Sequence, residues 1–444
     1  MHASLLAQLN DFPVPKRYLV ALSGGCDSIS LLHALTIIKP QLTCQKIQAL
    51  HINHGLQDTA QAWERHCQQF CDDKQIPLDV VRLKLSVPKG ESIEAYAREK
   101  RYQAFTEYMQ KGDMLLLAQH QNDQAATVLL QLLRGAGVRG LAAMPLIRQQ
   151  RDTWMARPLL SISREDIVAY ATSHSLHWVD DPSNEDERFD RNYIRHQIMP
   201  ALATRWPAVT ATLSRAAGHQ AEAIQLLNSL AAIDWEHCRV DESTDLSIRL
   251  LRNLDSARQR NLLRYWIGDI HRLSVPDSQH AQRIIDEVVH AAPSAQPLVE
   301  WAGVCVRRYR DNLVIEAHAS PSLTEWETTW DLSAPLTLPS GEVMLSRPAQ
   351  GSGIRLVHDA QEVQVRFRQG GERCRLPGRE HHHELKKLFQ TWGVPPWQRD
   401  RIPLIFIGDE LAQVVGYSVC EPFLATDGQH GVEIYLQDQL SSGH

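Results

Sequence analysis

Short apolar runs alternate with longer amphipathic stretches over the first two hundred residues of the chain. The runs of strand length are 18–22, 47–53, 78–83 and 114–118. The stretches with helical periodicity run from the first strand to about Ile37, over 59–75 and 91–110, and from the fourth strand to Arg134. Strands that alternate with helices of this length form βαβ units. The pattern therefore predicts an α/β domain with a doubly wound parallel sheet.

The pattern changes after Pro200, where Leu- and Ala-rich helical periodicity takes over as far as about His290. The clearest segments are 221–230, 250–267 and 280–290. They predict a separate helical domain. The next stretch, 293–353, is richer in Pro, Ser and Thr, and we expect it to be a connector.

Strand-like alternation returns near the C-terminal end. Val363, Val365 and Phe367 alternate with polar residues, as in a half-buried strand. The apolar runs 404–407 and 411–415 flank a Gly-Asp pair and predict a hairpin. We therefore expect a small α+β domain here. The predicted domains are 1–205, 206–330 and 331–444.

Composition supports several soluble domains. The chain has 444 residues, of which 43% are hydrophobic and 22% are charged, and its net charge is −6. That charge argues against attraction of the whole surface to nucleic acid, although a local basic patch is still possible. The first residues lack the pattern of a secretory signal, and no apolar run reaches membrane-spanning length. We expect no membrane contact.

Cysteine usage indicates a reducing compartment. The eight cysteines are scattered and include no CxxC pair, so we expect buried or free thiols and a cytoplasmic location. Cys67 and Cys71 are four residues apart on a predicted helix, a spacing that suits two core residues better than a metal site.

The first predicted strand runs directly into Ser23-Gly24-Gly25-Cys26-Asp27-Ser28 and then a helix. Two glycines permit positive φ and a close approach of backbone N–H groups to phosphate, and the start of the helix adds positive potential. The two serines add hydroxyl donors. Neither the Walker lysine pattern nor GxGxxG is present. The turn therefore predicts an anion site for a nucleotide at the crevice of a parallel sheet.

The hexapeptide resembles the loop of the pyrophosphate-loop ATP pyrophosphatase superfamily, whose members bind ATP, adenylate an oxygen of the substrate and release pyrophosphate. The resemblance implies an adenine nucleotide α-hydrolase-like fold for the first domain and ATP bound by Ser23, Gly24, Gly25, Cys26, Asp27 and Ser28. It also implies a catalytic part for Asp27. The hexapeptide alone does not choose among the members.

Further segments resemble one family, the tRNA(Ile)-lysidine synthetases. In order along the chain they are HINHG (51–55), EAYAREKRY (94–102), AQH (118–120), RGAG (134–137), RPLL (157–160), DDPSN (180–184) and RNYIR (191–195). The resemblance covers about 15–205 and resumes at 363–424.

Some of these residues have a chemical interpretation of their own. His51 ends the second predicted strand beside the first, where adenine or ribose is within reach, although a hydrogen-bonded loop histidine also fits. Glu94, Arg98 and Arg101 share one helical stripe, which suits either a solvated Glu–Arg pair or a cleft lining. In the family this helix lines the nucleotide and substrate cleft.

Two arginines, Arg191 and Arg195, lie on neighbouring turns of a predicted helix. They suit a clamp for a phosphate or a developing negative charge, or else a charged helix face. The resemblance favours the clamp, with Arg191 in a catalytic role. It also assigns His120 and Arg195 to substrate binding.

Positive charge gathers in the third predicted domain. The segment from Val363 to Arg401 contains nine Lys and Arg residues and four acidic residues, which gives a local charge of +5. Phe389, Trp392 and Trp397 are interleaved, as in contacts to an RNA backbone and exposed bases, although a solvated basic face fits equally well. Arg379, Lys386 and Lys387 are the predicted tRNA contacts. The His381–His383 run suits surface positions on a helix better than a metal site.

The resemblance implies a complete reaction. ATP adenylates O2 of the wobble cytidine in an isoleucine tRNA with a CAU anticodon, pyrophosphate leaves, and the amine of L-lysine displaces AMP. Asp123 is the catalytic acid and the expected Mg²⁺ ligand. A homodimer is possible. The alternatives are a tRNA thiolase of the same superfamily, which needs reactive cysteines, and a tRNA-binding homologue with impaired catalysis.

The chain departs from the family at one sensitive place. The family pattern HxDDQxET reads here as HQNDQAAT over 120–127, so Asn122 replaces an acid and Ala126 replaces a glutamate. Alanine neither binds a metal nor accepts a proton. If the glutamate acts directly, we expect the chemical step to be slowed by several orders of magnitude, as a rough expectation.

Overall fold

The computed structural model describes residues 1–53, 55, 60–83, 93–241, 243–292, 295, 297–317, 326–355 and 362–437, except the side chains of 60, 93–95 and 183–184. The chain divides into two compact units, Met1–Leu230 and Ala231–His444. The three domain boundaries expected from the sequence remain predictions. Among the described residues, no helix is long and apolar enough to cross a membrane.

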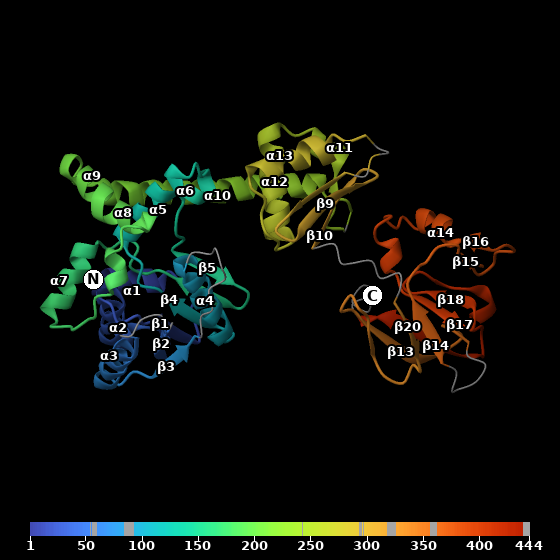
Figure 1. Cartoon of the computed structure of the whole chain (residues 1–444), viewed down its shortest axis with the longest axis horizontal. Coiled ribbons are helices and arrows are strands. Elements are labelled where there is room, and N and C mark those ends of the chain that lie inside the picture. Colours follow the sequence, from blue (N-terminus) through green and yellow to red (C-terminus); the bar gives the residue numbers. More distant parts are fainter. Residues whose placement is uncertain are drawn as a thin grey trace. The chain divides into compact units, whose positions relative to one another are not determined.

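The first unit is an α/β sheet domain (Figure 1). Its strands are β1 (Arg17–Ala21), β2 (Ile47–Asn53), β3 (Leu78–Arg82), β4 (Asp113–Leu116), β5 (Ile147–Gln150) and β6 (Thr153–Ala156). Its helices are α1 (His2–Asn10), α2 (Cys26–Ile38), α3 (Ala60–Asp73), α4 (Ile93–Tyr108), α5 (Gln121–Leu133), α6 (Val138–Leu141), α7 (Arg164–Ser173), α8 (Asp190–Tyr193) and α9 (Met199–Arg205). Short helical segments are η1 (Lys39–Gln41), η2 (Pro182–Glu185) and η3 (Ile194–Ile198), and α10 (Val209–Cys238) runs across the boundary between the units. The predicted α/β domain is confirmed.

The strand order is β3-β2-β1-β4-β6-β5, and every pair is parallel except β5–β6. From β1 the chain moves first to β2 on one side and later to β4 on the other. The carboxyl ends of β1 and β4 therefore form the switch point where open α/β sheets bind ligands. Ser23 follows β1 and His120 follows β4, so both predicted site segments lie at this point.

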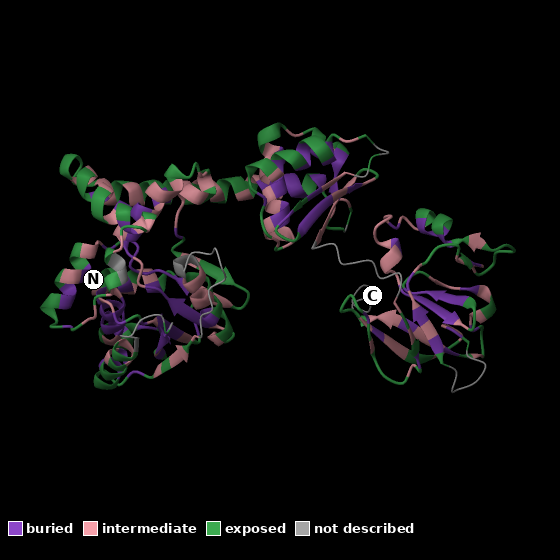
Figure 2. Cartoon of the chain, in the orientation of Figure 1, coloured by how far each residue is buried: buried purple, intermediate pink, exposed green. Residues whose placement is uncertain are grey.

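Alternate residues of β1 pack on opposite faces of the sheet. Tyr18 and Val20 lie in one apolar core with α1, α2, α3 and α7, whereas Leu19 lies in a second core with α4. Cys67 and Cys71 of α3 are fully buried in the first core, as their spacing predicted. Burial of both faces explains why this strand is a continuous apolar run (Figure 2).

The second unit begins with helices that cover a small antiparallel sheet. The helical segments are α11 (Ile248–Arg252), α12 (Ser256–Tyr265), η4 (Trp266–Ile270), α13 (Ser278–Arg283) and η5 (Ile284–Val289). The sheet, ordered β7-β10-β9-β8, contains β7 (Leu246–Ser247), β8 (Leu298–Trp301), β9 (Val304–Tyr309) and β10 (Asn312–Ala317). The predicted helical region is present. It ends in a sheet that the sequence analysis did not predict.

Two expectations are wrong here. The segment of helical periodicity expected over 250–267 is divided, because the Asp255 side chain accepts the N–H groups of Ala257 and Arg258 and starts a new helix. The expected connector over 293–353 contains β8–β10 and further strands. In β9, Val304 and Val306 pack in the apolar core, whereas Cys305 and Arg307 occupy the alternate positions, so the strand has no long apolar run.

The rest of the unit is strand-rich, as predicted. The strands are β11 (Glu327–Trp330), β12 (Leu336–Thr337), β13 (Val343–Gln350), β14 (Val363–Arg366), β15 (Arg373–Cys374), β16 (His383–Glu384), β17 (Leu404–Ile407), β18 (Glu410–Val414), β19 (Ser418–Val419) and β20 (His430–Leu436). The helical segments are α14 (Leu385–Thr391), η6 (Arg399–Arg401) and η7 (Glu421–Phe423). The predicted β17–β18 hairpin is confirmed, and Val363, Val365 and Phe367 are fully buried. His381 and His382 are exposed as predicted, but His383 lies in β16, because the helix begins only at Leu385.

Free thiols were expected throughout, and this is wrong for one pair. Cys374 and Cys420 form a disulfide at a sequence separation of 46, whereas the other six cysteines are free and buried. Spacing rules detect cysteines that are close in the sequence. Here strand β15 and the turn after β19 bring two distant cysteines together.

We predict that acid weakens the first unit through His33. Burial, with smaller effects from Lys74, His174 and His2, lowers the pKa of His33 to about 4. Its Nδ1 lies 2.8 Å from the Tyr170 hydroxyl. Between pH 6.5 and 4 the unfolded chain binds a proton that the folded chain excludes, so this stability is lost as pH falls.

The free energy of unfolding, measured by urea titration, should fall by on the order of 2 kcal/mol from this group between pH 7 and 4.5. His33→Gln should flatten that slope. The matched control, His219→Gln, changes an exposed histidine of α10 and should leave the slope as it is. Equal slopes in all three proteins would contradict the prediction.

Candidate functional site

The predicted anion turn, residues 23–28, comprises the turn between β1 and α2 and the first residues of that helix. Gly24 adopts φ +88°, a backbone conformation that residues with a Cβ atom rarely adopt. The Ser28 hydroxyl accepts the Ser23 N–H at 3.2 Å and donates to the Gly25 carbonyl at 3.0 Å. The same hydroxyl lies 3.0 Å from Ser23 Oγ. The two predicted serines therefore hold the turn in shape.

A second segment packs against this turn. The Val179 N–H donates to the Gly24 carbonyl at 3.0 Å, so the chain just before the predicted 180–184 loop lies on the turn. Cys26 is the first residue of α2 and is buried, and burial raises the pKa of its thiol. This cysteine is therefore a neutral packing residue of the turn, without the thiolate that thiolase chemistry needs.

His51 lies beneath the turn and is buried. Its Nδ1 donates to the Leu22 carbonyl at 2.8 Å, and Cys67 Sγ is 3.6 Å from the same nitrogen. Burial lowers the pKa of His51, so the ring is neutral and its proton is on Nδ1. These contacts support the end of β1. The predicted contact of His51 with a nucleotide remains a prediction.

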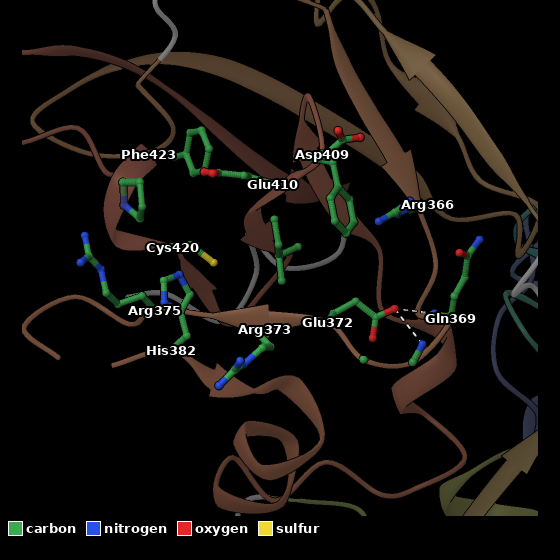
Figure 3. Close-up of a pocket in the computed structure, with 15 residues that line it drawn as sticks. Arg366, Gln369, Glu372, Arg373, Arg375, His382, Asp409, Glu410, Cys420 and Phe423 are labelled. Carbon is green, nitrogen blue, oxygen red and sulfur yellow. Dashed lines mark hydrogen bonds between the residues drawn. The ribbon is translucent and has the colours of Figure 1, made fainter. Parts of the chain in front are cut away.

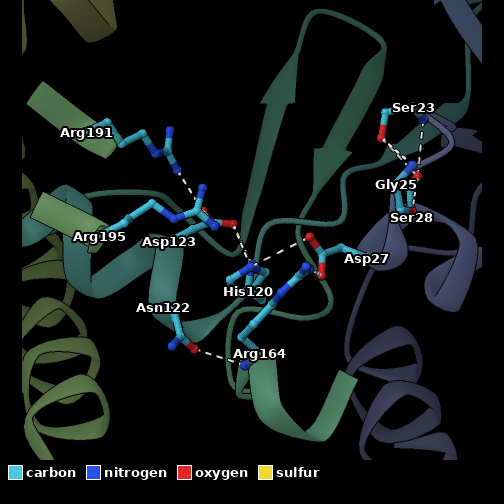
Figure 4. Close-up of polar contacts among 10 residues, drawn as sticks. All are labelled: Ser23, Gly25, Asp27, Ser28, His120, Asn122, Asp123, Arg164, Arg191 and Arg195. Atoms are coloured by element: carbon cyan, nitrogen blue, oxygen red, sulfur yellow. Dashed lines mark hydrogen bonds and ion pairs between the residues drawn. The ribbon is translucent and has the colours of Figure 1, made fainter. Parts of the chain in front are cut away.

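The predicted residues Asp27, His120 and Asp123 form one continuous row (Figure 4). His120 Nε2 lies 3.8 Å from Asp27 Oδ2 and 3.4 Å from Asp123 Oδ2. His120 is fully buried, and neither of its ring nitrogens has a hydrogen-bond partner among the residues that the structure describes. Asp123 Oδ2 also accepts the backbone N–H of His120 at 3.2 Å and caps the start of α5.

Arginines occupy the outer side of each carboxylate. Arg191 Nη2 lies 3.1 Å and Arg195 Nη2 3.6 Å from Asp123 Oδ1. Arg164 pairs with Asp27 Oδ1. The side chains of Arg191 and Arg195 are 24% and 28% exposed, so each arginine can pair with its aspartate and still present N–H groups to a ligand.

Burial and charge act in opposite directions on this row. Burial lowers the pKa of His120, outweighing the two neighbouring aspartates, so the imidazole is neutral at pH 7. Burial alone would raise the pKa of Asp123, but His120, Arg191 and Arg195 together lower it. The row therefore carries two negative charges from carboxylates and three positive charges from guanidinium groups. This excess of positive charge suits a polyanion.

Arg164 also belongs to this site, although the sequence did not predict it. Its backbone N–H donates to Asn122 Oδ1 at 2.9 Å, and its guanidinium reaches Asp27 (Figure 4). One sequence signal marks the position, because Ser163 and Asp166 form the start of a helix directly after the RPLL segment. Asn122, which replaces a family acid, thus holds the N-terminal end of α7 against α5.

Ala126 lies one turn after Asp123 on α5 and is fully buried. It packs in an apolar cluster with Ala125, Ile194 and Met199. This cluster fixes the helix that carries Arg191 and Arg195.

The predicted stripe on α4 is described only in part. The Glu94 side chain lies outside the described residues. The Arg98 guanidinium lies 5.2 Å from the Tyr102 ring centroid and is exposed, and Arg101 is half-buried one turn further on. Their predicted roles in substrate binding are not tested by these contacts.

In the second unit, the predicted basic residues are exposed but their aromatic partners are not. Arg379, Lys386 and Lys387 are exposed, the two lysines on α14. Phe389 is fully buried in an apolar core, so its expected contact with exposed bases is wrong. Phe389 lies on the same face of α14 as Leu385 and Leu388, and this face packs inward. Trp397 donates its indole N–H to Glu316 at 2.6 Å.

A polar cavity of about 440 Å³ lies beside this basic region (Figure 3). Arg366, Arg373 and Arg375 line it together with acidic side chains. Glu372 Oε1 accepts the N–H groups of Gln369 and Gly370 at 2.6 and 2.8 Å, which shapes the loop at its edge. The cavity combines cationic and carboxylate groups, and its lining includes two phenylalanines, Phe406 and Phe423.

Comparison with known proteins matches three parts of the chain to family models. A PP-loop domain matches residues 2–202, a TilS substrate binding domain 246–314, and a TilS substrate C-terminal domain 363–436. The tRNA(Ile)-lysidine synthase of Coxiella burnetii is 42% identical over 421 residues, which are 95% of this chain and 93% of the relative. The synthase of Methylococcus capsulatus is 42% identical over 401 residues, 90% of this chain and 91% of that protein.

Among solved structures, the U34-tRNA thiolase NcsA from Methanococcus maripaludis with its [4Fe-4S] cluster is similar to part of the chain. It matches with a TM-score of 0.42 and 17% identity, over 50% of this chain and 79% of the thiolase.

We predict that Gly24→Ala destabilises the first unit. A Cβ at this position would lie 3.1 Å from Cys67 Sγ, and the backbone is at φ +88°. The strained backbone should cost about 1–2 kcal/mol of unfolding free energy. Gly218→Ala is the control, because Gly218 lies in α10 with nothing within 4 Å of its added Cβ, and it should be neutral or stabilising. Thermal unfolding of both variants checks this, and equal melting temperatures would contradict it.

Proposed function

This chain belongs to the tRNA(Ile)-lysidine synthase family, and on that premise we propose that it uses ATP to join L-lysine to C2 of the wobble cytidine of an isoleucine tRNA with a CAU anticodon. The single observation that carries the proposal is the row Asp27–His120–Asp123 with its three arginines beside the anion turn. This row lies at the switch point of the sheet, where such folds bind nucleotides.

The proposed roles begin at the turn. Backbone amides of residues 23–28 and the start of α2 hold the phosphates of ATP, and His51 supports the turn from below. O2 of the cytidine attacks the α-phosphorus, the bond to the β-phosphate oxygen breaks, and pyrophosphate leaves. Arg191 and Arg195 lie where they can stabilise the charge that develops on it.

The second half of the reaction uses the same centre. The lysine amine attacks C2 of the adenylated cytidine, and AMP leaves with the former O2. Asp123 and Asp27 hold the arginines in position, and the neutral His120 keeps the two carboxylates apart. The contribution of the protein is to orient the substrates and to keep water from the adenylated base.

Mg²⁺ is the expected companion of ATP and supplies charge neutralisation on its phosphates when bound. The residues present do not fit a metal site built by the protein. Among the described residues, no group of three His, Cys, Asp or Glu side chains is arranged to hold a metal ion. Asp123, the predicted ligand, faces two arginines. We therefore assign Mg²⁺ to the nucleotide and derive no step from a protein-held ion.

We propose that the exposed basic residues of the second unit bind the tRNA. Arg379, Lys386 and Lys387 suit backbone phosphates, and the arginine-lined cavity beside them suits an unpaired nucleotide. Glu94, Arg98 and Arg101 are proposed as further substrate contacts. We also propose a cytoplasmic location and a homodimer.

The thiolase alternative is not favoured. The relatives are lysidine synthases, the sequence has no CxxC pair, and the cysteine in the anion turn is buried with a raised pKa. The remaining alternative is a tRNA-binding homologue with impaired catalysis.

The test is release of AMP and pyrophosphate from ATP in the presence of the unmodified tRNA(Ile). We expect AMP formation to require both tRNA and lysine, with the lysine carried into the tRNA. A tRNA with a non-CAU anticodon is the control and should give background rates. Tight tRNA binding without AMP formation would instead support the impaired homologue.

We predict that Ala126→Glu raises the rate of lysidine formation by about ten-fold or more. A glutamate here would restore the acid of the family pattern one turn after Asp123 on α5. The control is Ala126→Gln, which has nearly the same shape without the charge and should not raise the rate. Single-turnover measurement of lysine incorporation decides. Rapid turnover by the unchanged chain, with no effect of the glutamate, would contradict the prediction.

A further inference from the structure

The disulfide between Cys374 and Cys420 joins two segments that line the polar cavity of the second unit. Cys374 lies in β15, directly between Arg373 and Arg375, and both arginines belong to the lining. Cys420 lines the cavity itself, and Phe423 follows it in the same wall (Figure 3). The bond therefore links the segment that carries two of the cavity's arginines to the segment that carries one of its aromatic rings.

The segment with the two arginines lies outside the large sheet of the unit. Among the described residues, β15 pairs with β16 alone, in a ladder separate from the sheet β11-β14-β17-β18-β19. The Glu421 N–H donates to the Arg375 carbonyl at 2.8 Å, and Arg375 Nε lies 3.8 Å from Glu421 Oε2. The Arg375 side chain is 35% exposed, so this ion pair is weak. The disulfide is the covalent link that fixes the segment against the opposite wall.

A small thiol can reach this bond from the cavity. Cys374 and Cys420 are only 1% and 2% exposed and pack in an apolar core, which shields them from bulk solvent. Cys420 nevertheless lines a cavity of about 440 Å³, which admits a small molecule. Attack on the Cys420 sulfur gives a mixed disulfide and leaves Cys374 as the departing thiolate. Reduction therefore begins on the cavity side.

The other cysteines do not compete in this chemistry. All six are free and buried. Burial raises the pKa of the Cys67 and Cys71 thiols to about 12 and that of Cys238 to about 11. A buried neutral thiol is a poor nucleophile, so these residues stay reduced. Thiol–disulfide exchange is thus confined to the pair at the cavity.

We propose that the Cys374–Cys420 disulfide is a redox-controlled link, and that its reduction weakens the binding of tRNA at the cavity. The proposal rests on the proposed function, because it regulates a tRNA contact assigned there. In the reduction, two molecules of a low-molecular-weight thiol become one small disulfide. Their two protons and two electrons pass to the cysteine sulfurs, which become thiols. In the cytoplasmic location proposed above, the disulfides of proteins are usually transient and serve catalysis or redox sensing.

Reduction changes the cavity and leaves the catalytic row as it is. Without the covalent link, Arg373 and Arg375 occupy a wider range of positions, and ordering them on RNA phosphates costs more entropy. The row of Asp27, His120 and Asp123 belongs to the first unit, which has no disulfide among its described residues. We therefore expect KM for tRNA to rise on reduction and kcat at saturating tRNA to stay within about two-fold.

The first measurement counts thiols. The full chain is incubated with oxidised glutathione, denatured, alkylated with iodoacetamide and weighed by mass spectrometry. We expect six alkylated cysteines, and all eight after treatment with dithiothreitol. Peptide mapping should identify Cys374 and Cys420 as the pair. Eight alkylated cysteines in the oxidised sample would overturn the inference.

The second measurement compares the affinity of the oxidised and reduced chain for the unmodified tRNA(Ile). Reduction by dithiothreitol should raise Kd by about five-fold or more, and oxidised glutathione should restore it. Cys374→Ser with Cys420→Ser should bind as the reduced chain does and should not respond to dithiothreitol. Cys374→Ser alone breaks the same link with one substitution, should the double variant fail to fold. The matched control is Cys305→Ala, which removes a buried free thiol of the same unit and should keep the full response.

The outcomes separate the two proposals. Equal affinity of the oxidised and reduced chain, or a response that persists without the two cysteines, would overturn this inference and leave the proposed function standing. A fall in kcat at saturating tRNA with KM unchanged would also overturn it, because the effect would then lie outside the tRNA contact. No tRNA binding in either state would contradict the proposed function itself, and the inference with it.

Discussion

The ion pairs between Asp123 and the arginines of the α8–η3 segment are the interactions on which the site depends. They join the end of β4, through α5, to a segment about 70 residues further along the chain. Asp123 is 11% exposed, and loss of one partner from a buried pair typically costs about 3–5 kcal/mol. The apolar contact of Ala126 with Ile194 reinforces the same junction. The positions of the two arginines therefore depend on the contact between α5 and the α8–η3 segment.

The anion turn depends on a different constraint, which is the backbone. Gly24 adopts a positive φ, and its carbonyl accepts a hydrogen bond from the Val179 N–H. His51 then holds the end of β1 from the neighbouring strand. Because these supports come from the sheet and from the segment before α8, the turn and the arginine row share one rigid frame. Catalysis that works by positioning needs such a frame.

The second unit uses many of its basic residues to build itself. Arg368 pairs with Asp400, Arg399 donates to the Val394 carbonyl, and Arg366 lies over the Phe406 ring. These arginines help to hold the loops around the strands. The two lysines of α14, in contrast, are exposed. A count of positive residues in the sequence therefore overstates the charge that an RNA would meet.

The sequence by itself determined the elements whose information is local. Apolar runs placed the ends of β1–β4 to within two residues, because the central strands pack apolar side chains on both faces of the sheet. The two glycines of the anion turn indicated the site, since they report a backbone requirement. The motifs around His120 and Arg191 indicated the family.

Only the tertiary structure decided which charges meet. Arg164 is 137 residues from Asp27, and no local pattern links them. The sheet over 298–317 was missed, because its short strands mix polar and apolar residues and derive their stability from cross-strand pairing. The burial of Phe389 and the pairing of Cys374 with Cys420 likewise result from contacts between distant segments. Local patterns report what one element needs, whereas the balance of two carboxylates against three guanidinium groups exists only once β1, β4, α7 and α8 have packed together.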